Sequence, residues 1–111
     1  QEVVRFTVVE YDGLLVGCAA LYPFIDERAA EMACVAVVPQ YRRAGLGEML
    51  LGRMESRARA LGVERLFVLT TRTADWFRER GFREAPPEDL PRQKREMYDV
   101  SRRSKIFMKA L

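Results

Sequence analysis

The sequence predicts an α/β (α+β) fold in which a mixed central sheet is flanked by helices, and two observations carry this prediction. First, short runs of β-branched and aromatic residues alternate with turn signals through residues 5–38, as in antiparallel hairpins. Second, an apolar run at 32–38 leads through a glycine-containing loop into apolar residues at helical spacing, and another strand-like run follows at 65–70. A strand, a helix and a strand in succession favour a parallel pair joined by a right-handed crossover.

The first part of the chain is typical of three antiparallel strands. Arg5–Glu10 is the first, Asp12-Gly13 is a strong hairpin turn signal, and Leu14–Tyr22 returns as the second. After a polar connection, Ala30–Val38 forms the third strand, which Pro39 ends. These three strands are expected to form a meander.

The second part of the chain alternates helices with strands. Apolar residues recur at helical spacing through Leu46–Leu61, and Gly62 is typical of a helix C-terminus. The remaining predicted elements are a strand at Arg65–Thr70, a short helix at Ala74–Arg80 ended by Gly81, an extended piece from Phe82, a helical turn near Arg92–Tyr98 and a last strand at Ser104–Lys109.

The loop between the third strand and the long helix has the features of a phosphate site. The first N–H groups of a helix have no partner within the helix, and the helix dipole favours an anion there. Gly45 and Gly47 allow a ligand to approach the main chain, and Arg42 and Arg43 add positive charge. The alternative is a strand-to-helix turn sharpened by its glycines, with two solvated arginines.

Composition excludes several classes of protein. With 49% hydrophobic and 32% charged residues, the chain is expected to fold as one globular domain over residues 1–111. The net charge of +3 comes from dispersed arginines and fits a small polyanionic ligand as well as nucleic acid. A nucleic-acid module is disfavoured because no aromatic–basic platform or recognition helix stands out. No apolar run reaches transmembrane length.

The titratable residues limit the chemistry. The sequence contains no histidine, so acid–base steps must use carboxylates, tyrosine, cysteine, lysine or hydroxyls. Cys18 and Cys34 both lie in apolar runs and are expected to be reduced thiols of a cytoplasmic protein, with a disulfide across a hairpin as the alternative. No metal-ligand spacing occurs, so no metal is expected.

Several motifs resemble one known family. The loop Arg42–Gly47 fits the pattern Q/R-x-x-G-x-G/A and resembles the acetyl-CoA pyrophosphate loop of the GNAT family of N-acetyltransferases. Glu31–Val38 resembles the family's central strand, and Trp76–Phe82 resembles its second motif, a short aromatic-rich helix ending in Gly-Phe. Within the family, the bacterial N-acetylglutamate synthases are most similar, through blocks at 18–24, 31–37, 65–71, 76–82 and 102–105.

The resemblance implies a GNAT fold that lacks the family's first strand and two helices, which would precede Gln1. The synthases also carry an amino-acid-kinase-like domain ahead of this one. A longer parent, or another source of the missing front, is therefore expected. Domains of this family often pair with one another through their last strands, which implies a homo-oligomer.

The implied reaction is transfer of the acetyl group of acetyl-CoA to the amino group of L-glutamate, by direct attack in a ternary complex. A covalent route through Cys34 is disfavoured because no histidine is present to activate the thiol. Two alternatives are another acceptor amine, such as a peptide N-terminus, a polyamine or another amino acid, and a non-catalytic domain that binds acetyl-CoA or arginine.

The resemblance also assigns the cofactor contacts. The central strand would pair with the pantetheine arm, and one N–H near Val35, freed by a bulge, would stabilise the oxyanion of the tetrahedral intermediate. Phe77 has core packing as its alternative role. The expected acetyl-CoA contacts are Val35, Ala36, Val37, Arg42, Arg43, Ala44, Gly45, Leu46, Gly47, Phe77 and Arg80.

Three residues are candidates for proton transfer. Glu31 opens the third strand and would accept the proton of the substrate amine, although a charged strand end is the plainer interpretation. Thr70 is expected to protonate the departing thiolate on the strength of the resemblance, with helix capping as its alternative role. Tyr98 is a second candidate acid, because a phenol is intrinsically better suited than an aliphatic hydroxyl.

The acceptor's carboxylates are assigned to the end of the chain. Arginine matches a carboxylate with two parallel hydrogen bonds, and Arg102 shares a strand face with Ser104. The resemblance adds the backbone of Cys34. The alternative is a solvated basic edge strand.

Overall fold

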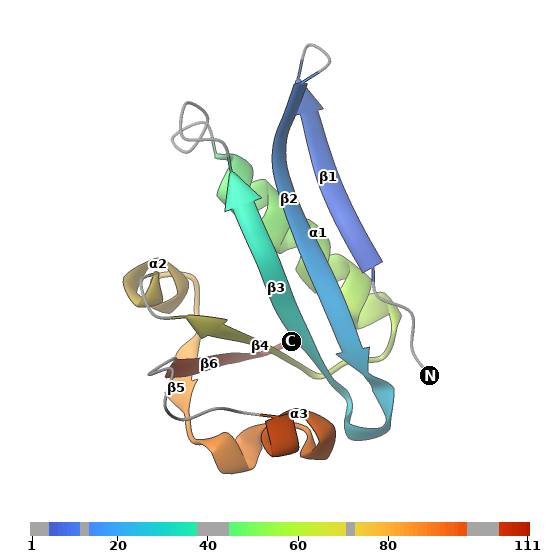
Figure 1. Ribbon diagram of the computed structural model, residues 1–111, viewed down its shortest axis with the longest axis vertical. Helices are drawn as coiled ribbons and strands as arrows, with labels where there is room; N and C mark the ends of the chain where they lie inside the picture. Colours follow the sequence, from blue (N-terminus) through green and yellow to red (C-terminus); the bar gives the residue numbers. More distant parts are fainter. Residues whose placement is uncertain (1–4, 12–13, 38–44, 71–72, 98–104) are drawn as a thin grey trace.

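The computed structural model describes residues 5–11, 14–37, 45–70, 73–97 and 105–111 (Figure 1). Within these residues, six strands form one mixed sheet in the order β1-β2-β3-β4-β6-β5. The elements in chain order are β1 (Arg5–Tyr11), β2 (Leu14–Phe24), η1 (Ile25–Glu27), β3 (Ala29–Val37), α1 (Leu46–Ala60), β4 (Arg65–Thr70), α2 (Ala74–Arg78), β5 (Arg83–Ala85), η3 (Pro87–Asp89), α3 (Arg92–Met97) and β6 (Lys105–Ala110).

The predicted topology is confirmed. β1, β2 and β3 form an antiparallel meander, and β3 pairs with β4 in parallel after the crossover through α1. β2 runs two residues further than predicted, because η1 and the left-handed Arg28 (φ 53°) turn the chain tightly and let Phe24 pair with Ala29. The register also pairs Cys18 with Ala36, so the hairpin does not bring Cys34 opposite Cys18.

Both predicted helix-ending glycines have positive φ. Gly62 (φ 81°) follows α1, where the Val63 N–H donates to the Ala58 carbonyl. Gly81 (φ 95°) follows α2, where the Phe82 N–H donates to the Phe77 carbonyl. α2 ends at Arg78 rather than at Arg80 because these last residues belong to the turn that Gly81 completes.

The parallel ladder between β3 and β4 is very short. It covers three residue pairs, from Ala29 opposite Arg65 to Glu31 opposite Phe67. Beyond them β4 pairs with β6 along its whole length, while β3 continues with β2 as far as Val37. The two strands therefore diverge, as their arrows do in Figure 1. We call this opening, between 31–37 of β3 and 67–70 of β4, the fork.

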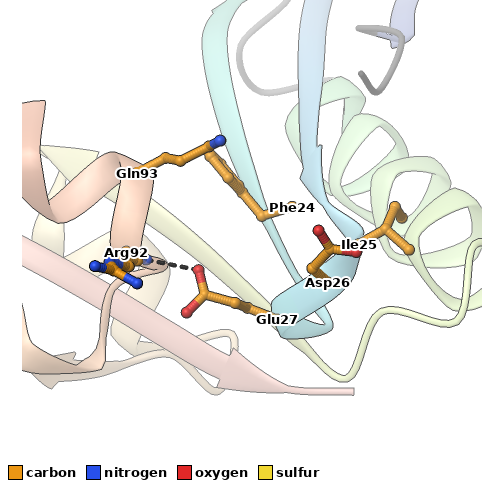
Figure 2. A pocket seen from close by; sticks show the side chains of 6 residues that line it. All are labelled: Phe24, Ile25, Asp26, Glu27, Arg92 and Gln93. Atoms are coloured by element: carbon orange, nitrogen blue, oxygen red, sulfur yellow. Dashed lines mark hydrogen bonds between the residues drawn. The ribbon is translucent and has the colours of Figure 1, made fainter.

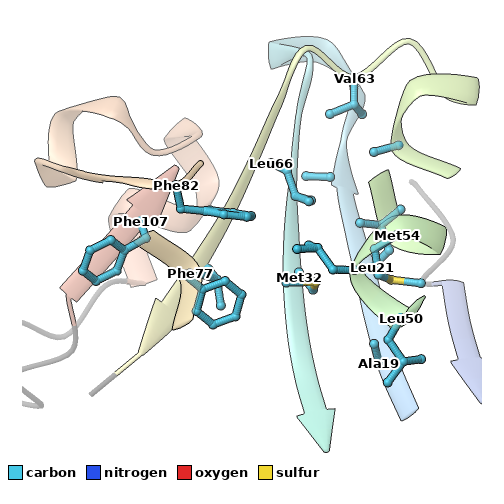
Figure 3. Packing of buried hydrophobic residues seen from close by; sticks show 14 residues of the cluster. Ala19, Leu21, Met32, Leu50, Met54, Val63, Leu66, Phe77, Phe82 and Phe107 are labelled. Carbon is cyan, nitrogen blue, oxygen red and sulfur yellow. The ribbon is translucent and has the colours of Figure 1, made fainter. Parts of the chain in front are cut away.

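The two faces of the sheet have separate apolar cores. On the first face, α1 contributes Leu50 and Met54, and Figure 3 shows them beside Leu21 and Met32 of the sheet. The same cluster continues past the fork to three phenylalanines near α2 and β6, namely Phe77, Phe82 and Phe107.

On the second face, Ala29, Phe67 and Ile106 pack against Leu90 from the connection between β5 and β6. Side chains alternate along a strand, so Glu31 shares this second face with Ala29, whereas Met32 points to the first. None of the helices in the described residues is long and apolar enough to cross a membrane.

The base of the fork depends on Phe67, which is fully buried and pairs with Glu31. We expect Phe67→Ala to lower the free energy of unfolding by about 3–5 kcal/mol, because it leaves a cavity in the second core. Urea denaturation followed by circular dichroism measures the loss. The control is Val8→Ala on β1, whose side chain is 50% exposed, so its change should stay within about 0.5 kcal/mol. Equal losses in both variants would contradict the expectation.

Candidate functional site

A cavity of about 290 Å³ lies in the fork. Its wall comes from both diverging strands and from the start of α2, so it exists only because the β3–β4 ladder stops early. The residues that line it are Glu31, Met32, Ala33, Val68, Leu69, Thr70, Thr73 and Phe77. Two of the three predicted proton-transfer residues therefore contact one cavity.

Glu31 lies at the base of the fork and is buried. Its Oε1 is 3.0 Å from the Nζ atom of Lys94 on α3, and the two side chains are only 11% and 22% exposed, respectively. The Lys94 ammonium group balances the negative charge of the Glu31 carboxylate, which is largely shielded from water. The sequence pattern pointed to Glu31 but not to Lys94, whose position near it depends on the long β5–β6 connection.

Contacts to η1 and β4 hold the start of α3 and η3 just before it on the second face. The Arg92 N–H donates to Glu27 Oε2 at 2.6 Å, as Figure 2 shows. Arg65 Nη1 donates to the Asp89 carbonyl, and its Nη2 donates to the Glu27 carbonyl, both at 3.2 Å. A second cavity, of about 370 Å³, lies beside these contacts and is lined by Phe24, Ile25, Asp26, Glu27, Arg92 and Gln93. The bond to Glu27 Oε2 fixes the start of the helix that carries Lys94, and the bond to Asp89 fixes η3 just before it.

Thr70 ends β4 at the other side of the cavity. Its Oγ1 accepts the Thr73 N–H at 3.1 Å and lies 2.7 Å from Thr73 Oγ1. An oxygen that accepts an N–H still carries its own proton for donation. Thr73 is the N-cap residue of α2, although its side chain makes no capping hydrogen bond.

Glu31 and Thr70 serve opposite faces of the sheet. Thr70 follows Leu66 and Val68 in strand alternation, and both of these pack in the first core. Glu31 belongs to the second face with Ala29 and Phe67. The fork therefore has the Thr70 hydroxyl toward the first face of the sheet and the Glu31 carboxylate toward the second.

The register of β3 contains the predicted bulge. Between the pairs Cys18–Ala36 and Ala20–Ala33, β3 advances one residue more than β2. The extra residue falls within Cys34–Val35, and such a residue leaves backbone groups outside the ladder. This irregularity lies along the fork, where an N–H directed into the opening would serve as an oxyanion donor.

Within the described residues, the N-terminus of α1 has no side-chain cap. Gly45 (φ 78°) is its N-cap residue and provides no side-chain cap, and the Met49 N–H donates the first helical bond, to the Gly45 carbonyl. The N–H groups of Leu46, Gly47 and Glu48 precede that bond in the helix. The left-handed conformation at Gly45 favours glycine, as the motif predicts.

Gly47 has a second role that the motif alone does not reveal. A Cβ atom built on Gly47 would lie 3.1 Å from Cζ2 of Trp76. The glycine therefore lets the indole of α2 pack directly on the first turn of α1.

Arg80 joins the same two helices. Its guanidinium lies 3.9 Å from the centroid of the Trp76 ring, donates to the Trp76 carbonyl at 2.9 Å, and pairs with Glu48 Oε1 at 2.7 Å. Its Nε is buried and has no hydrogen-bond partner within the described residues. A cation thus lies beside an open helix N-terminus, with a donor that can still accept a partner, which suits an anionic ligand.

Phe77 is buried and makes edge-to-face contacts with Trp76 and Phe82. It also lines the fork cavity, so core packing and ligand contact coincide in one side chain. Leu46 is half-buried at the start of α1.

The remaining predicted site residues are only partly described. The backbone of Cys34, Val35, Ala36 and Val37 lies in β3, but the placement of their side chains is outside the description. Arg42, Arg43, Ala44, Tyr98, Arg102 and Ser104 lie outside the described residues. Among the residues that are described, no group of three or more His, Cys, Asp or Glu side chains is arranged to hold a metal ion.

Comparisons with known proteins agree with this geometry. Residues 2–84 match the model of the acetyltransferase (GNAT) domain. The amino-acid acetyltransferase of Azotobacter vinelandii is 56% identical over 111 residues, which are all of this chain and 26% of that protein. The chain thus spans about a quarter of the length of the curated relatives it matches.

Solved structures show the same fold. The N-acetylglutamate synthase of Neisseria gonorrhoeae, complexed with coenzyme A and N-acetyl-glutamate, superposes with a TM-score of 0.90 at 44% identity, covering 96% of this chain and 25% of that one. An acetyltransferase of Streptococcus agalactiae gives 0.82 at 25% identity, covering 97% of this chain and 67% of that one.

The contact between Gly47 and Trp76 leads to a test with a matched control. Both Gly47 and Gly52 lie in α1, but a Cβ at Gly52 would meet nothing within 4 Å. Gly52→Ala should therefore stabilise the chain by about 0.5–1 kcal/mol, through helix propensity alone. Gly47→Ala should lose that gain and shift the fluorescence of Trp76, the only tryptophan. Thermal melts and emission spectra measure both effects, and equal stabilisation without a spectral shift would exclude the close packing.

Proposed function

Because the chain belongs to the GNAT acetyltransferase family, we propose that it catalyses transfer of the acetyl group of acetyl-CoA to the amino group of an amino acid, L-glutamate. The observation that carries the proposal is the fork, with a buried carboxylate at its base and a hydroxyl at its edge. Such an opening lets two substrates meet between strands while the protein supplies a base on one side and an acid on the other.

Acetyl-CoA is proposed to bind on the first face. Its pyrophosphate would accept hydrogen bonds from the main chain of Arg43–Gly47 at the open N-terminus of α1, with charge from Arg42, Arg43 and Arg80. Its pantetheine arm would add to β3 along 35–37, which β4 leaves unpaired. Within the part of the chain that the structure describes, Arg80 Nε has no hydrogen-bond partner and the start of α1 has no side-chain cap, which supports this placement.

The acceptor is proposed to enter from the second face, where Glu31 lies. Glu31 would take a proton from the acceptor ammonium, directly or through water, so that the neutral amine can attack the thioester carbonyl. An N–H at the Cys34–Val35 bulge would stabilise the resulting oxyanion. Collapse of the intermediate breaks the C–S bond, and Thr70 or Tyr98 would protonate the thiolate.

Glutamate is proposed as the acceptor for two reasons. A solved neighbour at 44% identity is an N-acetylglutamate synthase, complexed with N-acetyl-glutamate. Arg102 and Ser104, with the backbone of Cys34, would hold its carboxylates through charge-assisted hydrogen bonds. Acetyl-CoA and glutamate are thus the proposed small-molecule partners, and residues 1–111 are proposed to act as one domain.

The test is release of thiol from acetyl-CoA in the presence of L-glutamate, compared with a panel of other amino acids, polyamines and a peptide. We expect glutamate to give the highest kcat/KM. Glu31→Gln should lower kcat on the order of 10²-fold or more, because the base is lost, and should leave the Kd for acetyl-CoA nearly unchanged.

Glu55→Gln is the matched control for that substitution. Glu55 is 12% exposed and pairs with Lys109 at 2.7 Å, so it resembles Glu31 in burial and pairing but lies on α1. Its loss should leave kcat unchanged. A similar fall in both variants, or an equal loss of acetyl-CoA affinity in Glu31→Gln, would remove Glu31 from the role of base.

The acid is decided by a second pair of variants. If Thr70 protonates the thiolate, Thr70→Val should lower kcat on the order of 10²-fold, and Tyr98→Phe should change it little. The reverse result would assign the role to Tyr98. Because Thr70 Oγ1 also accepts the Thr73 N–H, Thr70→Ser, which keeps that bond, should restore activity if the hydroxyl itself is required.

A further inference from the structure

Lys94 places a primary amine where the acceptor amine is expected. Its Nζ lies 3.0 Å from Glu31 Oε1, within hydrogen-bonding distance of the proposed base at the fork. A substrate ammonium would have to occupy an equivalent position to pass its proton to Glu31. The lysine side chain therefore stands in for the substrate ammonium when no acceptor is bound.

We propose that Lys94 is a self-acetylation site, which this chain modifies with acetyl-CoA in the absence of an amino-acid acceptor. The inference rests on the proposed function, since it uses the same base and the same thioester. A solvated lysine of this chain would, by contrast, be acetylated only slowly, by direct reaction with acetyl-CoA in solution.

The step balances without a further reactant. Glu31 accepts one proton from the Lys94 ammonium, and the neutral amine attacks the thioester carbonyl. An N–C bond forms, the C–S bond breaks, and the thiolate takes up the second proton that the nitrogen loses. The products are Nε-acetyl-lysine, coenzyme A and one proton, which Glu31 releases to solvent.

The position of Lys94 is set by the fold rather than by a flexible surface. The start of α3 is held by the bond from the Arg92 N–H to Glu27, and η3 just before it is held by the bond from Arg65 to the Asp89 carbonyl. The Lys94 side chain is 22% exposed, so most of its length packs against protein. A fixed amine beside a base gains the rate advantage of proximity that a free side chain lacks.

The chain contains its own control. It has three lysines, and Lys109 matches Lys94 closely, because its Nζ is 2.7 Å from Glu55 and its side chain is 25% exposed. The Lys109–Glu55 pair links β6 to α1, whereas Glu31, the partner of Lys94, lines the fork cavity. Lys105 is exposed and reports the rate of reaction in solution. Burial and pairing are thus equal in two lysines that differ in their distance from the fork.

The experiment follows acetyl occupancy of all three lysines by peptide mass spectrometry, with acetyl-CoA and no acceptor. We expect Lys94 to react on the order of 10²-fold faster than Lys109 or Lys105, because only Lys94 has the proposed base in a reactive setting. Glu31→Gln should abolish this excess, and Glu55→Gln should leave it intact. Added L-glutamate should protect Lys94. Lys94→Arg should remove a stoichiometric burst of thiol release that occurs without acceptor.

Three outcomes would overturn the inference. Equal rates at the three lysines, or an excess at Lys94 that survives Glu31→Gln, would show ordinary solution acetylation. Glutamate-dependent thiol release with unmodified Lys94 would reject the self-acetylation and leave the proposed function standing. Absence of both acetylation and glutamate-dependent thiol release would reject the proposed function, and the inference with it. Circular dichroism checks that each variant is folded. If Glu31→Gln does not fold, loss of the thiol burst in Lys94→Arg still tests the inference.

Discussion

β4 pairs with its two neighbouring strands over different lengths, and the candidate site lies where the shorter pairing stops. It pairs with β6 through all six of its residues but with β3 through only three. β4 stays beside β6 to its end, and no strand of the described residues pairs with the facing edge of β3 beyond Glu31. Glu31 and Phe67 are the last residue pair before β3 and β4 diverge, so the fork begins at this pair.

The opening is useful because the two sides of the sheet are covered differently. α1 and α2 cover one side, and their ends bring together an uncapped helix terminus, Arg80 and Trp76. The β5–β6 connection covers the other side and brings Lys94 to Glu31. Recognition of a polyanion and handling of an amine need opposite charges. The fold places these charges on opposite faces of the sheet. The cationic groups near α1 and the carboxylate of Glu31 therefore lie in separate environments.

Features that depend on near neighbours in the chain were predictable from sequence. The strand at Arg65–Thr70, the start of the long helix at Leu46 and the glycines at 62 and 81 follow from local patterns, and the structure confirms each of them. The parallel crossover follows from element order and chirality. Glu31 and Thr70 are singled out by the family resemblance, because a place at a strand end is by itself equally typical of an ordinary charged or capping residue.

Features that depend on distant pairing were not predictable in this way. Lys94 has no periodic or motif context, and it lies near Glu31 because η1 bonds to the start of α3 and β4 bonds to η3 just before it. The packing of Trp76 on Gly47 requires two helices to meet, so the motif explains the glycine only in part. The bulge at Cys34–Val35 could be anticipated from the family's chemistry but not from local propensity.

α2 touches both ends of the candidate cleft. Its N-cap residue Thr73 bonds to Thr70 at the fork, while the Trp76 ring in the middle of α2 and Arg80 just beyond its end contact Gly47 and Glu48 at the start of α1. A helix of five residues is too short to bend and too well packed to slide. It therefore fixes the distance between Thr70 and the N-terminus of α1. A ligand that contacted both would be selected by its length as well as by its chemistry.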